Sequence, residues 1–322
     1  MKNTLKFESM KYESWVLSDR QICDLEMIMN GAFSPLNGFL RKNDYKKVLS
    51  EMRLVNGSLW PLPVMLDVEK EFSKKLTIGD KLTLKDKEGF SIAIIKIDDI
   101  WEPDLNIEAE LVFGTTDCSH PGVDYLLNQT NPVYLGGKIK TITLPRHYDY
   151  ENLRQTPSSL KKKFEQLGWE NIVAFQTRNP LHRAHVEMTL SALEEIDANL
   201  LIHPVVGMTK PGDVDHYTRV RCYEHVLGKY PNDKAILSLI PLAMRMGGPR
   251  EALWHAIIRK NYGCTHLIVG RDHAGVGDYY EPFGAQDIFD QDVVKNSLKI
   301  EIFKADHTAY SKKLNEVVMM RD

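Results

Sequence analysis

The chain has 322 residues, a formal net charge of −3 and a sequence pI near 6.4. This length is comfortable for two hydrophobic cores and therefore predicts two domains. The acidic balance argues against nucleic-acid binding, which normally needs a basic excess, and favours a small ligand. Because no stretch approaches the roughly 20 apolar residues that span a bilayer and no targeting segment is evident, we expect a soluble, cytoplasmic protein with no membrane partner.

The four cysteines are scattered, with no CxxC pair among them. Neither a zinc site nor a disulfide framework is predicted from such spacing, and we expect buried free thiols. A GxxxxGK[ST] sequence is also absent, which excludes a Walker-type kinase domain from this stretch of chain. The cysteines are Cys23, Cys118, Cys222 and Cys264.

The first half of the chain predicts a small strand-rich domain. Residues 19–50 look helical around a loop at residues 30–40, in which glycine and proline punctuate apolar side chains. We interpret this loop as packing structure, with ligand contact as the alternative. Segments rich in Val, Ile, Leu and Phe then alternate with turn signals, which predicts strands. These segments are residues 62–68, 81–84 and 90–97.

After Pro145 the pattern changes to repeated strand and helix units. Short apolar segments alternate with amphipathic ones, which predicts a parallel, doubly wound sheet. In such sheets, ligands bind at the carboxyl ends of the strands. The predicted strands are residues 171–175, 200–206, 235–240 and 265–270, and the predicted helices are residues 183–196, 216–230 and 250–262.

The most informative segment follows the first of these strands. Asn179 is a good N-cap and Pro180 a good first helical residue, so we expect a helix to start here with its free N–H groups and positive dipole end facing an anion. His182 and His185 then share one face of the first turn. Arg178 adds a fixed positive charge just before it. Together these residues predict a site for the phosphates of a nucleotide.

Simpler interpretations of the two histidines exist. His182 could close a turn and His185 could fill the core, but their combination with Gln176, Arg178 and Asn179 favours a ligand. A zinc site is disfavoured because helical zinc pairs usually lie four residues apart and need a third ligand, which the nearby sequence does not offer.

A second loop, residues 244–251, follows the strand that ends near residue 240 and runs into a helix with Pro249 at its start. Its two glycines would let the backbone approach an anion, and a plain flexible turn is an equal alternative. Trp254 and His255, on the helix that follows, are interpreted as packing residues.

A third loop, residues 270–277, places Arg271, Asp272 and His273 among small residues. A simple turn does not need three adjacent ionisable side chains, so we expect a ligand here too. Its glycine spacing does not meet the dinucleotide GxGxxG pattern. Residues 207–216 could close over a ligand, but their lysine is more simply solvated.

The residue types in these loops favour one kind of chemistry. No Ser-His-Asp arrangement, catalytic cysteine or acid–base carboxylate pair stands out. The loops offer cationic and amide donors around a polyanion, which suits phosphoryl or nucleotidyl transfer, where positioning and charge stabilisation supply most of the catalysis. The nucleophile would then belong to the second substrate.

With these motifs, the chain resembles the ATP sulfurylase (sulfate adenylyltransferase) family over nearly its whole length. The resemblance implies an α/β fold: a PUA-like β-rich domain in residues 1–147, followed in residues 148–322 by a doubly wound parallel-sheet nucleotidyltransferase domain of the HxGH superfamily. The segments that carry the resemblance are residues 31–39, 120–123, 176–185, 247–249 and 270–275.

The resemblance also implies a reaction, in which sulfate attacks the α-phosphorus of MgATP to give adenosine 5′-phosphosulfate and pyrophosphate. Sulfate would be bound by Gln176, Arg178 and the backbone of Ala274. Thr177, Arg178 and Asn179 correspond to the residues usually considered catalytic. The implied ATP-binding residues are Gln176, Thr177, Arg178, Asn179, His182, His185, Gly270, Arg271, Asp272, His273 and Thr308.

As cofactor, the resemblance implies Mg²⁺ carried with ATP, without a protein-bound metal site or zinc. We expect no nucleic-acid partner and a homo-oligomer, of which the dimer is the commonest form. Family members generally continue beyond the point that corresponds to residue 322, so the catalytic domain is expected to be truncated at its C-terminus and to close less completely over ATP.

Two rival functions stay open on the sequence alone. Another nucleotidyltransferase of the HxGH superfamily, acting on a phosphorylated acceptor, would share the twin histidines without needing Gln176, Arg178 and Ala274 as an oxyanion pocket. An RNA-binding module built on the PUA-like domain is disfavoured by the acidic balance. The direction of the reaction is equally open, because both directions use the same site.

Overall fold

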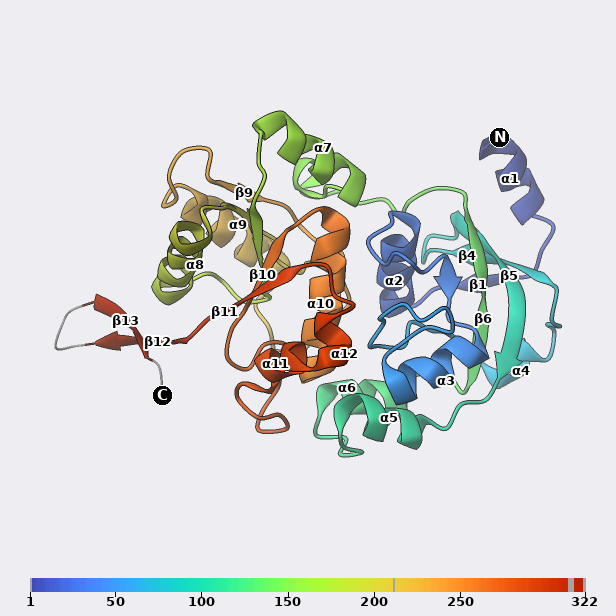
Figure 1. The fold of residues 1–322 in the computed structure, drawn as a ribbon. Helices are drawn as coiled ribbons and strands as arrows, with labels where there is room; N and C mark the ends of the chain where they lie inside the picture. Colours follow the sequence, from blue (N-terminus) through green and yellow to red (C-terminus); the bar gives the residue numbers. More distant parts are fainter. Residues whose placement is uncertain (1, 211, 312–315, 321–322) are drawn as a thin grey trace. The chain divides into compact units, whose positions relative to one another are not determined.

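A computed structural model describes residues 2–210, 212–311 and 316–320, with side chains for residues 4–210 and 212–306. The chain divides into two compact units, Met1–Tyr148 and Asp149–Asp322, and Figure 1 shows their elements. Across the described part of the chain, no helix combines the length and the apolar character needed to cross a membrane.

Unit 1 contains a six-stranded, mainly antiparallel sheet in the order β1-β4-β5-β6-β2, with β3 added to β6. Its longest strand, β5 (Ser91–Trp101), has both faces covered, because Ile94 and Ile95 point to opposite faces and are 3% and 0% exposed. The predicted strand-rich domain is therefore present. The other elements are α1 (Lys2–Ser9), β1 (Ser14–Val16), α2 (Asp19–Met29), β2 (Gly38–Phe39), α3 (Lys42–Glu51), β3 (Leu66–Val68), α4 (Lys70–Ser73), β4 (Lys81–Lys85), α5 (Leu105–Phe113), α6 (Pro121–Asp124), η1 (Tyr125–Gln129) and β6 (Val133–Thr141).

The loop predicted at residues 30–40 packs within unit 1. Ala32 and Phe33 are fully buried, and strand β2 pairs antiparallel with β6. A Cβ atom on Gly38 would lie 2.0 Å from the carbonyl oxygen of Gly137, so only glycine fits where these two strands meet. The structural interpretation of this loop is confirmed for these residues.

The four cysteines are free thiols, but only Cys264 is buried. The prediction that all of them are buried was wrong: Cys118 is exposed, and Cys23 and Cys222 are partly exposed. Cys118 lies in the turn that leads into α6, outside the regular elements that form the core of unit 1.

Unit 2 is built on a five-stranded parallel sheet in the order β11-β10-β7-β8-β9. The first strand in sequence, β7, lies at the centre, the next two lie on one side of it and the last two on the other. The order therefore reverses between β7 and β10, which is where doubly wound sheets bind ligands. The strands are β7 (Ile172–Phe175), β8 (Asn199–Ile202), β9 (Ala235–Leu237), β10 (His266–Val269) and β11 (Glu301–Lys304).

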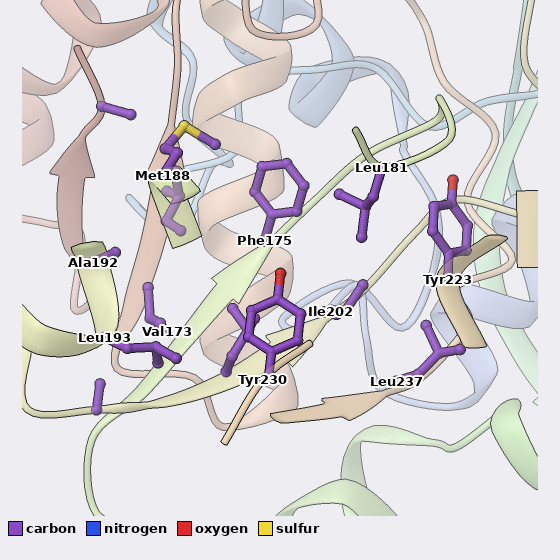
Figure 2. Packing of buried hydrophobic residues seen from close by; sticks show 14 of the residues in the cluster. Val173, Phe175, Leu181, Met188, Ala192, Leu193, Ile202, Tyr223, Tyr230 and Leu237 are labelled. Carbon is purple, nitrogen blue, oxygen red and sulfur yellow. The ribbon is translucent and has the colours of Figure 1, made fainter. Parts of the chain in front are cut away.

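Helices cover both faces of this sheet, as the alternating pattern predicted. Val173 and Phe175 point to one face and pack with residues of α8 (Arg183–Ile196) and α9 (His216–Leu227), as Figure 2 shows. The strand residues between them face α10 (Gly248–Tyr262), which packs against β10. The remaining elements are η2 (Glu151–Leu153), α7 (Pro157–Leu167), α11 (Gly284–Asp287), η3 (Ile288–Asp290), α12 (Asp292–Lys295), β12 (His307–Ser311) and β13 (Glu316–Met320).

Helix α8 spans residues 183–196, as the apolar pattern predicted, but its N-cap is His182 and not Asn179. An N-cap residue offers its carbonyl oxygen to the first turn of the helix. The carbonyl oxygen of Asn179 is instead occupied, since the hydroxyls of Thr177 and Tyr223 donate to it at 2.9 and 2.8 Å. The Asn179 N–H in turn donates to Thr177 Oγ1 at 3.0 Å. These contacts hold the residues before His182 in a loop, so the prediction of Asn179 as the N-cap was wrong.

Candidate active site

A pocket of about 360 Å³ lies at the carboxyl ends of the strands of unit 2, where the strand order reverses. The loop after β7 forms one wall and the loop after β10 forms the other. Both loops were predicted from the sequence as ligand loops. The lining residues are Phe175, Gln176, Thr177, Arg178, Asn179, His182, His185, Met188, Met244, Ile268, Gly270, Arg271, Asp272, His273, Ala274, Gly275 and Asp306.

Every predicted site residue with a described side chain lines this pocket. Thr308 lies in β12, and its side chain is outside the described part of the chain. Asp306 also lines the pocket but was not among the predicted residues, because β11, the strand it follows, was not predicted. Its place after a strand was a signal that could have found it. The apolar lining residues, such as Met188, carry no sequence signal that separates them from core residues.

A larger hollow, of about 780 Å³, lies elsewhere in unit 2. It is lined by α8 and by the segments that precede β8 and β9, including Asp197 and Lys234. These segments are at the amino ends of the strands. Ligands of doubly wound sheets bind at the carboxyl ends, where the ionisable side chains converge, so the smaller pocket is the candidate active site.

Arg178 is held by the carboxylate of Asp213, which was not a predicted site residue. Its Nη1 donates to both oxygens of Asp213, at 2.6 and 2.8 Å. The side chains are 16% and 6% exposed, respectively. Asp213 belongs to the 207–216 loop, which was considered weak evidence because a single lysine was its only obvious ligand group. The pairing brings this loop to the rim of the pocket.

The twin histidines stack at the start of α8. The ring centroids of His182 and His185 lie 3.8 Å apart with an interplanar angle of 28°. Burial, and then the neighbouring His182, lower the pKa of His185 to about 4. His185 is therefore neutral near pH 7, and its Nδ1 atom is buried without a hydrogen-bond partner. This Nδ1 atom can therefore form a hydrogen bond with a ligand at the N-terminal end of α8, where the helix dipole is positive.

A chain of largely buried polar side chains joins the two walls of the pocket. Gln176 Nε2 is 3.2 Å from Nε2 of His255, and Nδ1 of His255 is 3.0 Å from Nε2 of His273. Glu251 Oε1 lies 3.4 Å from the same Nε2 of His255. His255 was predicted to be a packing residue, and it is indeed fully buried. It also contacts both ligand loops, which a sequence pattern could not reveal.

The two glycines at the start of α10, Gly247 as the N-cap and Gly248 as the first helical residue, serve the structure. The N–H of Gly247 donates to Glu251 Oε2 at 2.9 Å, and the N–H of Gly248 donates to the carbonyl of Ala274 at 3.1 Å. These donors are therefore engaged within the protein, and neither glycine lines the pocket. Of the two interpretations left open for this loop, the structure favours a turn that braces the third loop.

The third loop has a strained backbone on both sides of His273. Asp272 and Ala274 have φ angles of 55° and 57°, which cost on the order of 1 kcal/mol each for residues other than glycine. The contact of Gly248 with Ala274 and a 2.8 Å bond from the Asp272 N–H to the Pro282 carbonyl hold this shape. Such strain is typical of functional loops.

Within residues 4–306, apart from residue 211, no group of three or more His, Cys, Asp or Glu side chains is arranged to hold a metal ion. The charged side chains of the pocket are mixed: Arg271 and Asp272 form an ion pair at 3.1 Å, and Asp306 adds a further carboxylate.

Together, the sheet order, the basic loop after β7 and the twin histidines at the start of α8 define a doubly wound α/β domain with a candidate anion-binding site where the strand order reverses, preceded by a β-rich domain. A family model described as ATP-sulfurylase matches residues 151–322, and a PUA-like domain model matches residues 1–144. The chain therefore belongs to the ATP-sulfurylase family.

Similar proteins extend beyond the length of this chain. A sulfate adenylyltransferase of Kluyveromyces lactis is 52% identical over 90% of this chain and 58% of its own length. One of Saccharomyces cerevisiae is 50% identical over 89% and 57%. Among solved structures, a hexameric APS kinase from Thiobacillus denitrificans superposes with a TM-score of 0.79 at 29% identity, covering 99% of this chain and 56% of the other. This chain thus spans little more than half the length of these relatives.

Proposed function

We propose that the protein is a sulfate adenylyltransferase. In the forward reaction a sulfate oxygen forms a bond to the α-phosphorus of MgATP while the bond between that phosphorus and the bridging oxygen to the β-phosphorus breaks. The products are adenosine 5′-phosphosulfate and pyrophosphate, and the reaction is reversible. Catalysis is assigned to residues 148–322, and residues 1–147 are assigned as the PUA-like domain.

One observation carries the proposal. The loop after β7 and the loop after β10 line a single pocket at the point where the strand order reverses, in a chain of the ATP-sulfurylase family. This arrangement can bring two anionic substrates together, because each loop supplies its own cationic or amide donors.

In this proposal Gln176, Arg178 and the backbone of Ala274 bind sulfate. Sulfate is a poor nucleophile and is repelled by the phosphates of ATP. A guanidinium group can offset that repulsion and bind two oxygens through its fork of N–H donors. Arg178 and Gln176 line the same pocket and are largely buried, so their interactions with an anion are screened little by water.

The departing pyrophosphate is assigned to the start of α8. His182 and His185 would donate hydrogen bonds to the β- and γ-phosphates as charge develops there, and Asn179 would donate to the α-phosphate. The positive end of the helix dipole acts in the same direction. Thr177, whose hydroxyl bonds the backbone of Asn179, would fix the shape of this loop.

The rest of the nucleotide is assigned to the third loop. Gly270, Arg271, Asp272 and His273 would contact ATP, and Thr308 would border the adenine. Gly270 supports this assignment because no atom lies within 4 Å of the position that a Cβ atom would take, which leaves room for a ligand.

Mg²⁺ enters the proposal with ATP. Magnesium retains several waters and often binds through substrate phosphates with few protein ligands. When bound, it would neutralise part of the charge on the phosphates. Protein-bound zinc forms no part of the proposal.

Oligomerisation and location are further parts of the proposal. The hexameric structural relative supports a homo-oligomer, and a dimer is the simplest closed form. Use of ATP and four free thiols, one of them exposed, favour a reducing cytoplasm. Light scattering after size-exclusion chromatography would measure the assembly.

The decisive experiment measures pyrophosphate release from MgATP with sulfate, without sulfate, or with phosphorylated metabolites in place of sulfate. We expect release that depends on sulfate and yields adenosine 5′-phosphosulfate. Release only with a phosphorylated acceptor would identify a different nucleotidyltransferase of the same superfamily. A filter-binding assay with RNA at several salt concentrations tests the non-enzymatic alternative, for which we expect no salt-dependent binding.

A further inference from the structure

The side-chain amide of Gln176 has one partner and one buried atom without a partner. Its Nε2 lies 3.2 Å from His255 Nε2, whereas its Oε1 is buried and makes no hydrogen bond. The residue is 8% exposed and lines the pocket. A buried polar atom without a partner costs free energy, so either the amide has the opposite orientation or a ligand completes it.

His255 decides between these two orientations, because it is the neighbour that the amide contacts. Burial outweighs the nearby Glu251 carboxylate and lowers the pKa of His255, so the ring is neutral near pH 7. A neutral ring carries one N–H and one lone pair. If Nε2 carries the lone pair, it must accept from the NH₂ group of Gln176. If Nε2 carries the hydrogen, it must donate to the oxygen of Gln176.

Glu251 selects the second of these states. Although burial raises its pKa, the hydrogen bond from His255 and the N–H groups of Arg245 and Gly247 hold it below the ordinary value, so Glu251 is a carboxylate. Those two N–H groups each donate at 2.9 Å and fix its position. With Glu251 Oε1 at 3.4 Å, a lone pair on His255 Nε2 would be repelled and an N–H attracted.

We propose that Glu251 and His255 position Gln176 so that its NH₂ group faces the pocket as a donor. His255 Nε2–H then donates to the Gln176 oxygen, and the NH₂ group occupies the place of the unpartnered atom. The inference rests on the proposed function, because a sulfate oxyanion can only accept hydrogen bonds. His255 and Glu251 are positioning residues, which act on the anion through Gln176.

The same state of His255 connects the two walls of the pocket. With the hydrogen on Nε2, His255 Nδ1 accepts from Nε2–H of His273, 3.0 Å away. His273 lies in the strained third loop and lines the pocket. A carboxylate buried on α10 therefore sets the donor and acceptor pattern of Gln176 and His273 together, and both loops present a defined pattern before any substrate arrives.

The first test reads the tautomer directly. Protein labelled with ¹⁵N-histidine gives long-range ¹H–¹⁵N spectra in which protonated and unprotonated ring nitrogens have different frequencies. The His255 signals are assigned by their loss in the His255→Gln variant. We expect Nε2 to be protonated and Nδ1 unprotonated at neutral pH. Protonation of Nδ1 alone would overturn the inference. This readout needs no substrate, so it stands apart from any failure of the proposed function.

The second test uses two substitutions at the same position. In His255→Gln, the new NH₂ group can occupy the place of Nε2–H and donate to Gln176, whereas His255→Leu has no donor. We expect His255→Leu to raise the sulfate KM about tenfold or more with an ATP KM within about threefold of the wild type, and His255→Gln to recover most of the loss. The control is His203→Leu, another fully buried histidine that does not line the pocket.

The outcomes separate positioning from simple packing. A packing role predicts that Leu and Gln at position 255 raise both KM values together, or that both lower the thermal midpoint without a selective change in sulfate KM. Either result would overturn the inference. A selective rise in sulfate KM for His255→Leu with recovery in His255→Gln supports it. If the wild type itself shows no turnover with sulfate, the proposed function fails, and the tautomer measurement still decides the orientation.

Discussion

Arg178 donates from Nη1 to both carboxylate oxygens of Asp213, at 2.6 and 2.8 Å. Both side chains are largely buried, and Arg178 lines the pocket. The carboxylate fixes the position of the guanidinium and also cancels part of the charge that an anionic substrate would meet. The fixed orientation of Arg178 should therefore favour turnover, whereas the negative charge of Asp213 should weaken anion binding. The substitution Asp213→Asn tests these two effects.

Asp213→Asn should lower kcat about tenfold or more, because Arg178 loses the contacts that fix its position. The sulfate KM should stay unchanged or fall, because a negative charge next to the guanidinium has been removed. Steady-state pyrophosphate release measures both constants. For the Asp213→Asn substitution, the control is Asp233→Asn, which removes a carboxylate at an exposed position in the loop before β9.

Arg178→Ala should remove adenylyl transfer, and it should also lower the thermal midpoint, because the largely buried Asp213 carboxylate loses its ion-pair partner. Near-normal sulfate-dependent release from Arg178→Ala would show that the sulfate assignment is wrong.

The twin histidines should affect turnover more than sulfate binding. His182→Ala and His185→Ala each remove a donor assigned to the departing pyrophosphate, a loss that typically lowers kcat about 100-fold. We expect the sulfate KM to change little in either variant. His225→Ala, at an exposed position on α9, is the matched control. If activity lost in these variants returned with excess Mg²⁺, the histidines would act through the metal and the pyrophosphate assignment would be incorrect.

Acid should destabilise the protein through His185. Its pKa is about 4 in the folded chain, below its ordinary value of 6.5, so the unfolded chain binds more protons between these pH values. The contribution is present above pH 6.5 and is lost as the pH falls towards 4. Between pH 7 and pH 4.5, we expect the unfolding free energy of His185→Asn to fall by on the order of 2 kcal/mol less than that of the wild type. Urea unfolding at pH 7 and pH 4.5 would measure it.

The pKa values of His203, His255 and His273 are lowered too, mainly by desolvation, and these residues contribute with the same sign. The His185→Asn variant should therefore keep part of the acid sensitivity. An unchanged difference in unfolding free energy between the two pH values would show that the folded protein accommodates a charged His185.

Replacement of two glycines near the pocket by alanine should change the unfolding free energy of the protein by different amounts. Gly248 has a φ angle of 51°, and an added Cβ would lie 2.7 Å from the ring of Tyr280, whose hydroxyl is fixed by the Met246 carbonyl. Gly248→Ala should cost about 1–3 kcal/mol of unfolding free energy. Gly270→Ala should be neutral or slightly stabilising, because nothing lies within 4 Å of its added methyl.

Gly270 lines the pocket, so Gly270→Ala should raise the ATP KM although the fold is unaffected. Denaturant unfolding and steady-state kinetics on both variants would check the pair. Equal losses of unfolding free energy in the two variants would contradict the expected difference.

The sequence by itself determined the elements and the ligand loops. Alternating apolar segments predicted strands β7 to β10 and helices α8 to α10 of unit 2, because side-chain periodicity follows from backbone geometry, whereas β11 was not predicted. Arg178 and His273 were identified because ionisable residues directly after buried strands must lie at one edge of a parallel sheet. The N-cap was wrongly predicted at Asn179 because local capping rules do not include a hydroxyl that arrives from α9, here that of Tyr223.

Only the tertiary structure decided which partners these residues meet. Asp213 lies 35 residues from Arg178, and His255 lies 79 residues from Gln176. No local periodicity encodes contacts over such separations, since they depend on how helices and loops pack across the sheet. The sequence therefore specified which groups could bind anions, whereas packing determined the orientation, ionisation and hydrogen-bond donors that each of them presents.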